Sequence, residues 1–185
     1  MPRIRAIETA EAAPKARKLL DGVQKKLGMT PNLMRTMANS PAVLEAYLGF
    51  SNSLGQSSLS PKLREQIALA VGELNRCQYC LAAHCALGKM AGLGDEEIAD
   101  SRRGVSPDRK TEAVLRFAGK VVSERGWVSD EDVQSIRAVG VTDAEIAEIV
   151  AAVALNIFTN YINHVAGTEV DFPEVEASEA PTCSC

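Results

Sequence analysis

The sequence lacks several features that would assign it to a common class. Its 185 residues carry 20 Lys and Arg against 24 Asp and Glu, a formal net charge of −4. Because nucleic-acid-binding proteins usually cluster basic residues to neutralise phosphates, we expect no nucleic-acid partner. No uninterrupted apolar run approaches the ~18 residues that span a bilayer, and residues 1–20 lack the apolar core of a signal peptide. We therefore expect a cytoplasmic protein with no membrane partner.

Cysteine is scarce and unevenly distributed. The five cysteines form one group at Cys77, Cys80 and Cys85 and another at Cys183 and Cys185. A secreted disulfide scaffold would spread an even number along a shorter chain. In a reducing compartment, redox exchange, catalysis or metal binding is the better interpretation.

Alternating β-branched runs, which are typical of strands, are also missing. Ser-Pro pairs, capping boxes and single glycines instead predict an all-α fold. The expected helices span residues 14–27, 31–38, 41–55 and 61–74, with further helices starting at positions 75, 106, 129 and 142. We expect one domain over residues 1–173 and a flexible tail over residues 174–185. Residues 60–84 and 142–164 share an outline that suggests a degenerate duplication.

The segment from Asn75 to His84 carries the residues most suited to chemistry. If Asn75 caps a helix, Cys77 lies in its first turn, where unpaired N–H groups and the helix dipole favour a thiolate. At about 100° per residue, Cys77, Cys80 and His84 fall within a sector of roughly 60°. An imidazole four residues from Cys80 can take the thiol proton, and Cys77 can close a disulfide.

Glu65 is expected to join this group. The predicted apolar stripe of its helix includes Leu63 and Leu74, and the predicted solvent sector includes Gln66, but Glu65 belongs to neither. It projects from a face of small apolar residues that can pack closely against another helix. A carboxylate there needs a partner, so we expect Glu65 to orient His84, which in turn activates Cys80.

Other interpretations of the same residues remain open. The cysteines can be small core residues, and Glu65 an ordinary surface carboxylate. Cys77, Cys80 and His84 can also ligate zinc in a structural site, with Cys85, His164 or a tail cysteine as the fourth ligand. Acid/base catalysis by Glu65 and His84 without a thiol step is a further alternative. Elsewhere, packing is expected for Tyr79 and Cys85, structural hydrogen bonding for His164, and no role for Cys183 and Cys185.

At these residues the sequence resembles the superfamily of carboxymuconolactone decarboxylases and alkylhydroperoxidase D, in its peroxidase-related branch. The resemblance rests on Glu65, eleven intervening residues, Cys77-Gln-Tyr-Cys80, three more residues and His84. It extends upstream to Ser40-Pro-Ala-Val-Leu-Glu-Ala-Tyr-Leu and downstream through Asn160-Tyr-Ile-Asn-His-Val-Ala. It implies an all-helical homo-oligomer, a trimer or hexamer.

The resemblance also implies a thiol-dependent reduction of organic hydroperoxides without a cofactor. Cys80 matches the cysteine that attacks the peroxide, Cys77 its disulfide partner, and Glu65 and His84 the proton relay. A dithiol reductant then restores the pair. One departure is Tyr79, since alkylhydroperoxidase D has a histidine just before its second cysteine. The superfamily's lactone decarboxylases lack the Cys-x-x-Cys pair, which makes decarboxylation the weaker assignment.

Overall fold

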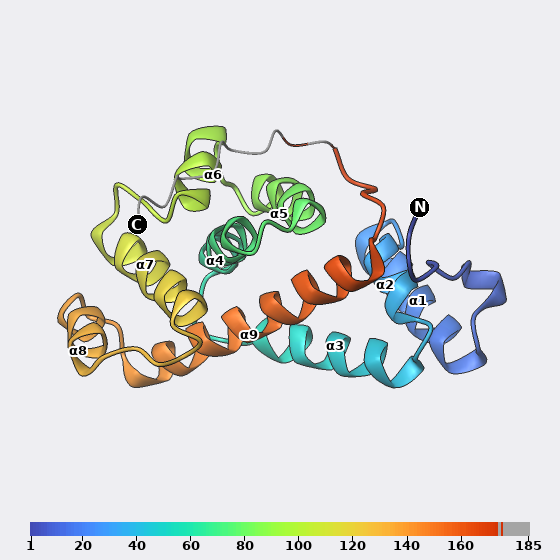
Figure 1. The fold of residues 1–185 in the computed structure, drawn as a ribbon, viewed down its shortest axis with the longest axis horizontal. Helices are drawn as coiled ribbons and strands as arrows, with labels where there is room; N and C mark the ends of the chain where they lie inside the picture. The colour runs from blue at the N-terminus through green and yellow to red at the C-terminus, as the bar shows by residue number, and fades with distance from the viewer. Residues whose placement is uncertain (174, 176–185) are drawn as a thin grey trace.

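The computed structural model describes residues 1–173 and 175, and in this part of the chain it is all-α, with no strand. The helices are labelled in Figure 1. They are the 3₁₀ helix η1 (Thr9–Glu11) and the α-helices α1 (Pro14–Leu27), α2 (Asn32–Met37), α3 (Pro41–Leu54), α4 (Pro61–Leu74), α5 (Gln78–Met90), α6 (Asp95–Arg102), α7 (Arg109–Ser123), α8 (Asp130–Ala138) and α9 (Asp143–Ala166). The all-α prediction is thus confirmed.

Most helices begin where the predicted caps lie. The side chain of Ser60 accepts a hydrogen bond from the Leu63 N–H at the start of α4, and Thr142 forms a capping box at the start of α9. The predicted start at Ser106 is wrong, because the carboxylate of Asp108 accepts from the Thr111 N–H and α7 begins after it. Helix α6 was not predicted, although Glu97 caps the Gly94 N–H.

Helix α4 lies at the centre of the molecule and packs against α5, α6, α7 and α9 (Figure 1). Because neighbours surround it, its middle is buried on every side from Gln66 to Gly72. Placing Gln66 in a solvent sector was therefore wrong, and Leu74, expected in the apolar stripe, is 51% exposed. A Cβ added to Gly72 would lie 3.8 Å from the Cys80 Cβ, so the predicted close helix contact is the one between α4 and α5.

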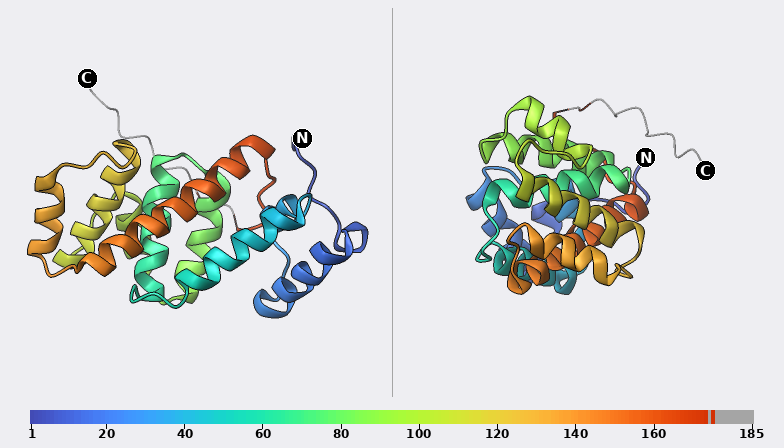
Figure 2. Two further views of the ribbon diagram at one scale, coloured as in Figure 1. Left: turned by 90° about the horizontal axis from the view of Figure 1, so that it is seen from below. Right: turned by 90° about the vertical axis from the view of Figure 1, so that its left-hand side faces the viewer.

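Helix α9 crosses the molecule beside α3 (Figures 1 and 2). By length and composition alone its 24 residues could cross a membrane, with a mean hydropathy of 1.3 in the most apolar window. From the sequence, no membrane-spanning segment was expected, because charged residues such as Glu148 interrupt the apolar sequence of this helix. Helices that fill protein cores pass the same test. The helix also runs straight through Asn156, whereas Asn75 ends α4, so the two segments of the suggested duplication differ in backbone.

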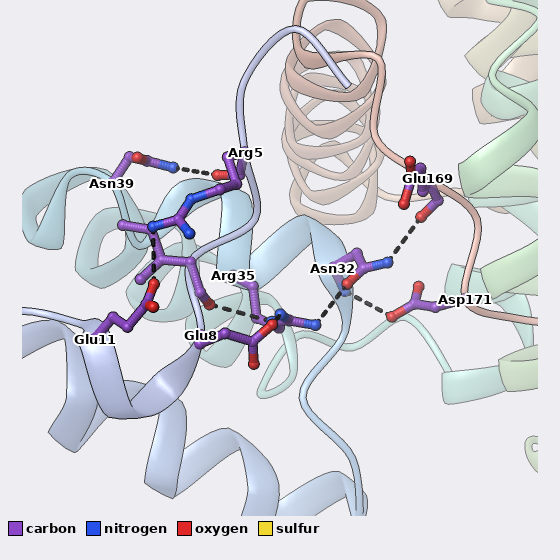
Figure 3. A network of polar contacts seen from close by, with 9 residues as sticks. Arg5, Glu8, Glu11, Asn32, Arg35, Asn39, Glu169 and Asp171 are labelled. Carbon is purple, nitrogen blue, oxygen red and sulfur yellow. Dashed lines mark hydrogen bonds and ion pairs between the residues drawn. The ribbon is translucent and has the colours of Figure 1, made fainter. Parts of the chain in front are cut away.

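The two ends of the described chain meet on α2 (Figure 3). Near the C-terminal end, Asp171 accepts a hydrogen bond from the Asn32 N–H at 2.7 Å, and the Asn32 side chain donates to the Glu169 carbonyl at 3.1 Å. From the other side, the Arg35 Nε donates to the Ile7 carbonyl at 3.1 Å. These contacts hold residues 171–173 over the N-terminal half of α5, beside the predicted cysteine pair.

Candidate functional site

The site is built where the chain turns from α4 into α5. Asn75 ends α4 and Arg76 adopts a positive φ of 52°, while the Cys77 N–H donates to the Gly72 carbonyl at 2.9 Å. The prediction that Asn75 caps the following helix is therefore wrong, because Asn75 is the C-cap of α4. Cys77 is the N-cap of α5, and Cys80 lies in the first turn. The favourable end of the helix dipole thus acts on Cys80.

The two sulfur atoms lie side by side inside the protein. Cys77 and Cys80 are 1% and 2% exposed, and both are free thiols. The Cys77 thiol donates to the Cys80 Sγ across 2.8 Å. A small movement brings the pair within the usual bond length of a disulfide, about 2.05 Å.

Glu65 and His84 meet between α4 and α5. The Glu65 Oε2 lies 2.7 Å from the His84 Nδ1, and both side chains are about four-fifths buried, with 22% and 21% exposure. His84 follows Cys80 by one helical turn on the same face of α5. Glu65 thus holds the imidazole ring through this hydrogen bond, and the predicted contact between Glu65 and His84 is present.

The surroundings separate the acidities of the two thiols. The hydrogen bond from Cys77 is the largest cause that lowers the pKa of Cys80, whereas burial of the sulfur raises this pKa. The charge of His84 and hydrogen bonds to Asn163 and Asn160 lower it further. The pKa of Cys80 is lowered to about 6 as a result. The pKa of Cys77 is raised, chiefly because it donates to Cys80 and because it is buried. The lowered pKa of Cys80 and the raised pKa of Cys77 favour Cys80 as the thiolate of the pair.

The surroundings of His84 favour its cationic form, because they raise its pKa. Burial alone would lower its pKa, but the charge and hydrogen bond of Glu65, together with the sulfur of Cys80, raise that pKa above its usual value. A cationic imidazole beside a thiolate can stabilise the anion and later give up its proton.

An apolar cavity of about 290 Å³ opens onto Cys80 and His84. Its walls come from separate parts of the chain: the end of α1, the start of α2, α3, one face of α5, α9 and the C-terminal segment held on α2. Apolar and aromatic side chains among them include Met34, Tyr47, Ala83, Leu87, Met90 and Phe172. Sequence analysis did not single out Tyr47, whose pKa is raised to about 12 by burial and by the nearby charges of Cys80 and Glu65.

Helix α9 supplies polar groups that sequence analysis also missed. The Asn163 Nδ2 donates to the Cys80 Sγ at 3.2 Å, and the Asn160 Oδ1 accepts from the Asn75 Nδ2 at 2.8 Å. Both residues are buried, at 4% and 0% exposure. The two asparagines are three residues apart and so share one face of an otherwise apolar helix. This pattern in the sequence could have marked them as functional candidates.

The remaining sequence candidates have other surroundings. Tyr79 accepts a hydrogen bond from the Leu33 N–H at 3.1 Å and packs edge-on against Phe172, with ring centroids 5.7 Å apart. Cys85 is buried, which raises its pKa. The side chain of His164 is exposed, and its carbonyl accepts from Arg3. The predicted tail at residues 174–185, with Cys183 and Cys185, lies outside the described residues apart from Val175.

The described residues do not support the zinc interpretation. Within residues 1–173 and 175, no three His, Cys, Asp or Glu side chains converge as a metal site would require.

A family model matches the part of the chain that contains the candidate site. A family model described as the carboxymuconolactone decarboxylase family matches residues 41–122, which contain Glu65, Cys77, Cys80 and His84. No curated protein matches the chain.

Solved structures match over most of the chain. An AhpD-core, peroxidase-related protein from Ralstonia eutropha JMP134 shares 25% identity with a TM-score of 0.84, covering 92% of each chain. A peroxidase-related protein from Silicibacter sp. TM1040 shares 27% identity with a TM-score of 0.79, over 90% of this chain and 91% of that one. The debrominase Bmp8 shares the fold at 18% identity, with a TM-score of 0.78 and 91% coverage of each chain.

Proposed function

The chain belongs to the superfamily of carboxymuconolactone decarboxylases and AhpD-like proteins, and from that premise we propose that it is an oxidoreductase that reduces organic hydroperoxides with a cysteine pair. One observation carries the proposal: two free sulfur atoms, 2.8 Å apart, adjoin a Glu65–His84 pair at the end of an apolar cavity. We further propose that it acts in the cytoplasm.

In the first step, the Cys80 thiolate attacks the terminal, hydroxyl oxygen of the hydroperoxide. An S–O bond forms, the O–O bond breaks, and the leaving alkoxide takes a proton from the His84 imidazolium to give an alcohol. Cys80 is oxidised to a sulfenic acid while the hydroperoxide is reduced. Glu65 keeps the imidazole in position through its hydrogen bond to Nδ1.

In the second step, the sulfur of Cys77 attacks the sulfur of the Cys80 sulfenic acid. The S–S bond forms, the S–O bond breaks, and the departing hydroxide takes the Cys77 proton to leave as water. An external dithiol then reduces the disulfide by thiol exchange and becomes a disulfide itself.

The walls of the cavity favour a substrate with an apolar body. Residues such as Met34, Leu87 and Phe172 offer contact area to an alkyl or aromatic group but few polar groups to a small peroxide. An organic hydroperoxide therefore gains binding free energy that hydrogen peroxide does not.

A homo-oligomer, with a trimer or hexamer as the expected form, is part of the proposal. The outer face of α9 carries exposed apolar side chains, among them Val150, Phe158, Tyr161 and Val165. Their spacing of three, four or eight residues keeps them on one stripe of the helix, a surface that a second copy of the chain can cover.

Alkylation by iodoacetamide provides a test of the Cys80 thiolate. Its rate is expected to be half-maximal near pH 6, because the pKa of Cys80 is lowered to about 6 and the thiolate, present above that pKa, is the reactive form. Peptide mass spectrometry over pH 4–10 separates this reaction from that of Cys85, whose raised pKa delays its labelling to higher pH. A midpoint for Cys80 at or above the ordinary value of about 8.5 would contradict the proposal.

Filling the cavity should change substrate preference. Ala86 lines the cavity and is partly exposed, so Ala86→Phe adds a ring with little disturbance of the core. We expect kcat/KM for cumene hydroperoxide to fall about tenfold or more, while that for hydrogen peroxide changes less than about twofold. Parallel losses for both substrates would show that the cavity does not hold the organic group.

Acid/base catalysis by Glu65 and His84 on a carboxylated substrate is the competing interpretation. The two interpretations differ in their need for sulfur. Activity that survives in the double variant Cys77→Ser, Cys80→Ser would favour acid/base catalysis, whereas loss of all activity supports the thiol route.

A further inference from the structure

Three buried asparagines, Asn156, Asn160 and Asn163, follow one face of the otherwise apolar α9. Their exposed fractions are 7%, 0% and 4%. The Asn156 Nδ2 donates to the Ala152 carbonyl at 2.9 Å, and the Asn160 Oδ1 accepts from the Asn75 Nδ2, while the Asn160 Nδ2 has no partner among the described residues. The side-chain amide of Asn163 instead donates to the sulfur of Cys80 at 3.2 Å. Asn163 therefore makes direct contact with the atom proposed to react.

The arrangement is unfavourable for a neutral thiol. A thiol sulfur is a weak acceptor, and the Asn163 Oδ1 is buried without a hydrogen-bond partner among the described residues. A buried amide that gains so little would destabilise the fold. An anionic sulfur accepts a far stronger, charge-assisted hydrogen bond, which accounts for the orientation of the amide.

We propose that Asn163 is a catalytic residue whose side-chain amide binds the Cys80 thiolate and favours it over the thiol. The role rests on the proposed function of Cys80 as nucleophile. The amide donates to the attacking sulfur from α9, while the Cys77 thiol donates to it from the start of α5. When the sulfur is oxidised its negative charge disappears, so the hydrogen bond is strong only in the state that reacts with substrate.

Titratable groups from several elements also face this sulfur. They are Cys77 and His84 at α5 and Tyr47 on α3, with Glu65 of α4 behind His84 and Asp171 of the C-terminal segment lining the same cavity. The hydrogen bond from Asn163 is among the causes that lower the pKa of Cys80. An Asn163 variant leaves every one of these titratable groups in the chain, so a change in the titration of Cys80 reports on the amide.

The test compares Asn163→Leu with Asn156→Leu, a matched change on the same buried face of α9. The readout is the pH midpoint of Cys80 alkylation by iodoacetamide, followed by peptide mass spectrometry. We expect the midpoint to rise by one pH unit or more in Asn163→Leu, with a corresponding tenfold loss of thiolate below the midpoint, and to stay unchanged in Asn156→Leu. An unchanged midpoint in a folded Asn163→Leu would overturn the proposal.

A measurement on the unaltered protein decides the matter if Asn163→Leu does not fold. In ¹⁵N-labelled protein, the side-chain amide protons of Asn163 should shift with the same midpoint as Cys80 alkylation. Amide signals that do not move across this titration would overturn the proposal. Both readouts are independent of turnover: a shifted midpoint without peroxide reduction would refute the proposed function, and with it a catalytic role, but would still show that Asn163 binds the Cys80 thiolate.

Discussion

Replacing Cys80 by serine is expected to lower kcat/KM for organic hydroperoxides by at least about 1000-fold, because a serine hydroxyl is not ionised at neutral pH. The thiolate that attacks the O–O bond is then absent, while Glu65, His84 and the cavity remain. Steady-state assays with cumene hydroperoxide and a dithiol donor measure the effect. Retention of more than about a tenth of the activity would exclude Cys80 as the nucleophile.

The two other cysteines of the site region serve as controls. In Cys77→Ser the first step is intact but no disulfide can form, so a single turnover should leave a sulfenic acid on Cys80 that dimedone traps. Cys85→Ser changes a buried thiol on the same helix that does not line the cavity, and should keep nearly full activity. Loss of activity in Cys85→Ser equal to that in Cys80→Ser would point to a folding defect.

Glu65→Gln is expected to lower kcat/KM about 100-fold near pH 7. The amide can still meet the His84 ring, but it carries no negative charge to keep the imidazole cationic, so the pKa of His84 falls. Without the cation beside it, the Cys80 thiol has a raised pKa and the alkoxide loses its proton donor. A plot of rate against pH should therefore shift to a higher midpoint.

Glu73→Gln is the matched control for that change. Glu73 lies on the same helix and pairs with Arg102 at 2.6 Å, away from the imidazole. It should lower thermal stability while leaving the pH midpoint where it is. Identical pH profiles for Glu65→Gln and the unaltered protein would remove Glu65 from the relay.

Several helix ends that local sequence determines were predicted correctly. Pro61 follows its capping serine at the start of α4, and Gly28 ends α1 in the left-handed conformation, with a φ of 75°. The contact of Glu65 with His84 also followed from local pattern, because the small residues beside Glu65 admit a close neighbour. In each case a few adjacent residues carry the information.

Features that depend on tertiary packing were not predicted. The solvent sector assigned to Gln66 failed because α4 has helices on all sides, which a single amphipathic pattern does not reveal. The cavity is assembled from segments more than 100 residues apart, such as Met34 and Phe172, so no local motif marks it. Asn163 lies 83 positions from Cys80, and only the packing of α9 on α5 brings them together.

The central claim is that Cys77 and Cys80 form a redox pair driven by hydroperoxide. The most direct test treats the reduced, metal-free protein with one equivalent of cumene hydroperoxide and maps the cysteine linkages by peptide mass spectrometry. The account predicts rapid consumption of the peroxide with one new disulfide, between Cys77 and Cys80, and an equal amount of alcohol. Free thiols at both positions beside unconsumed peroxide would contradict it.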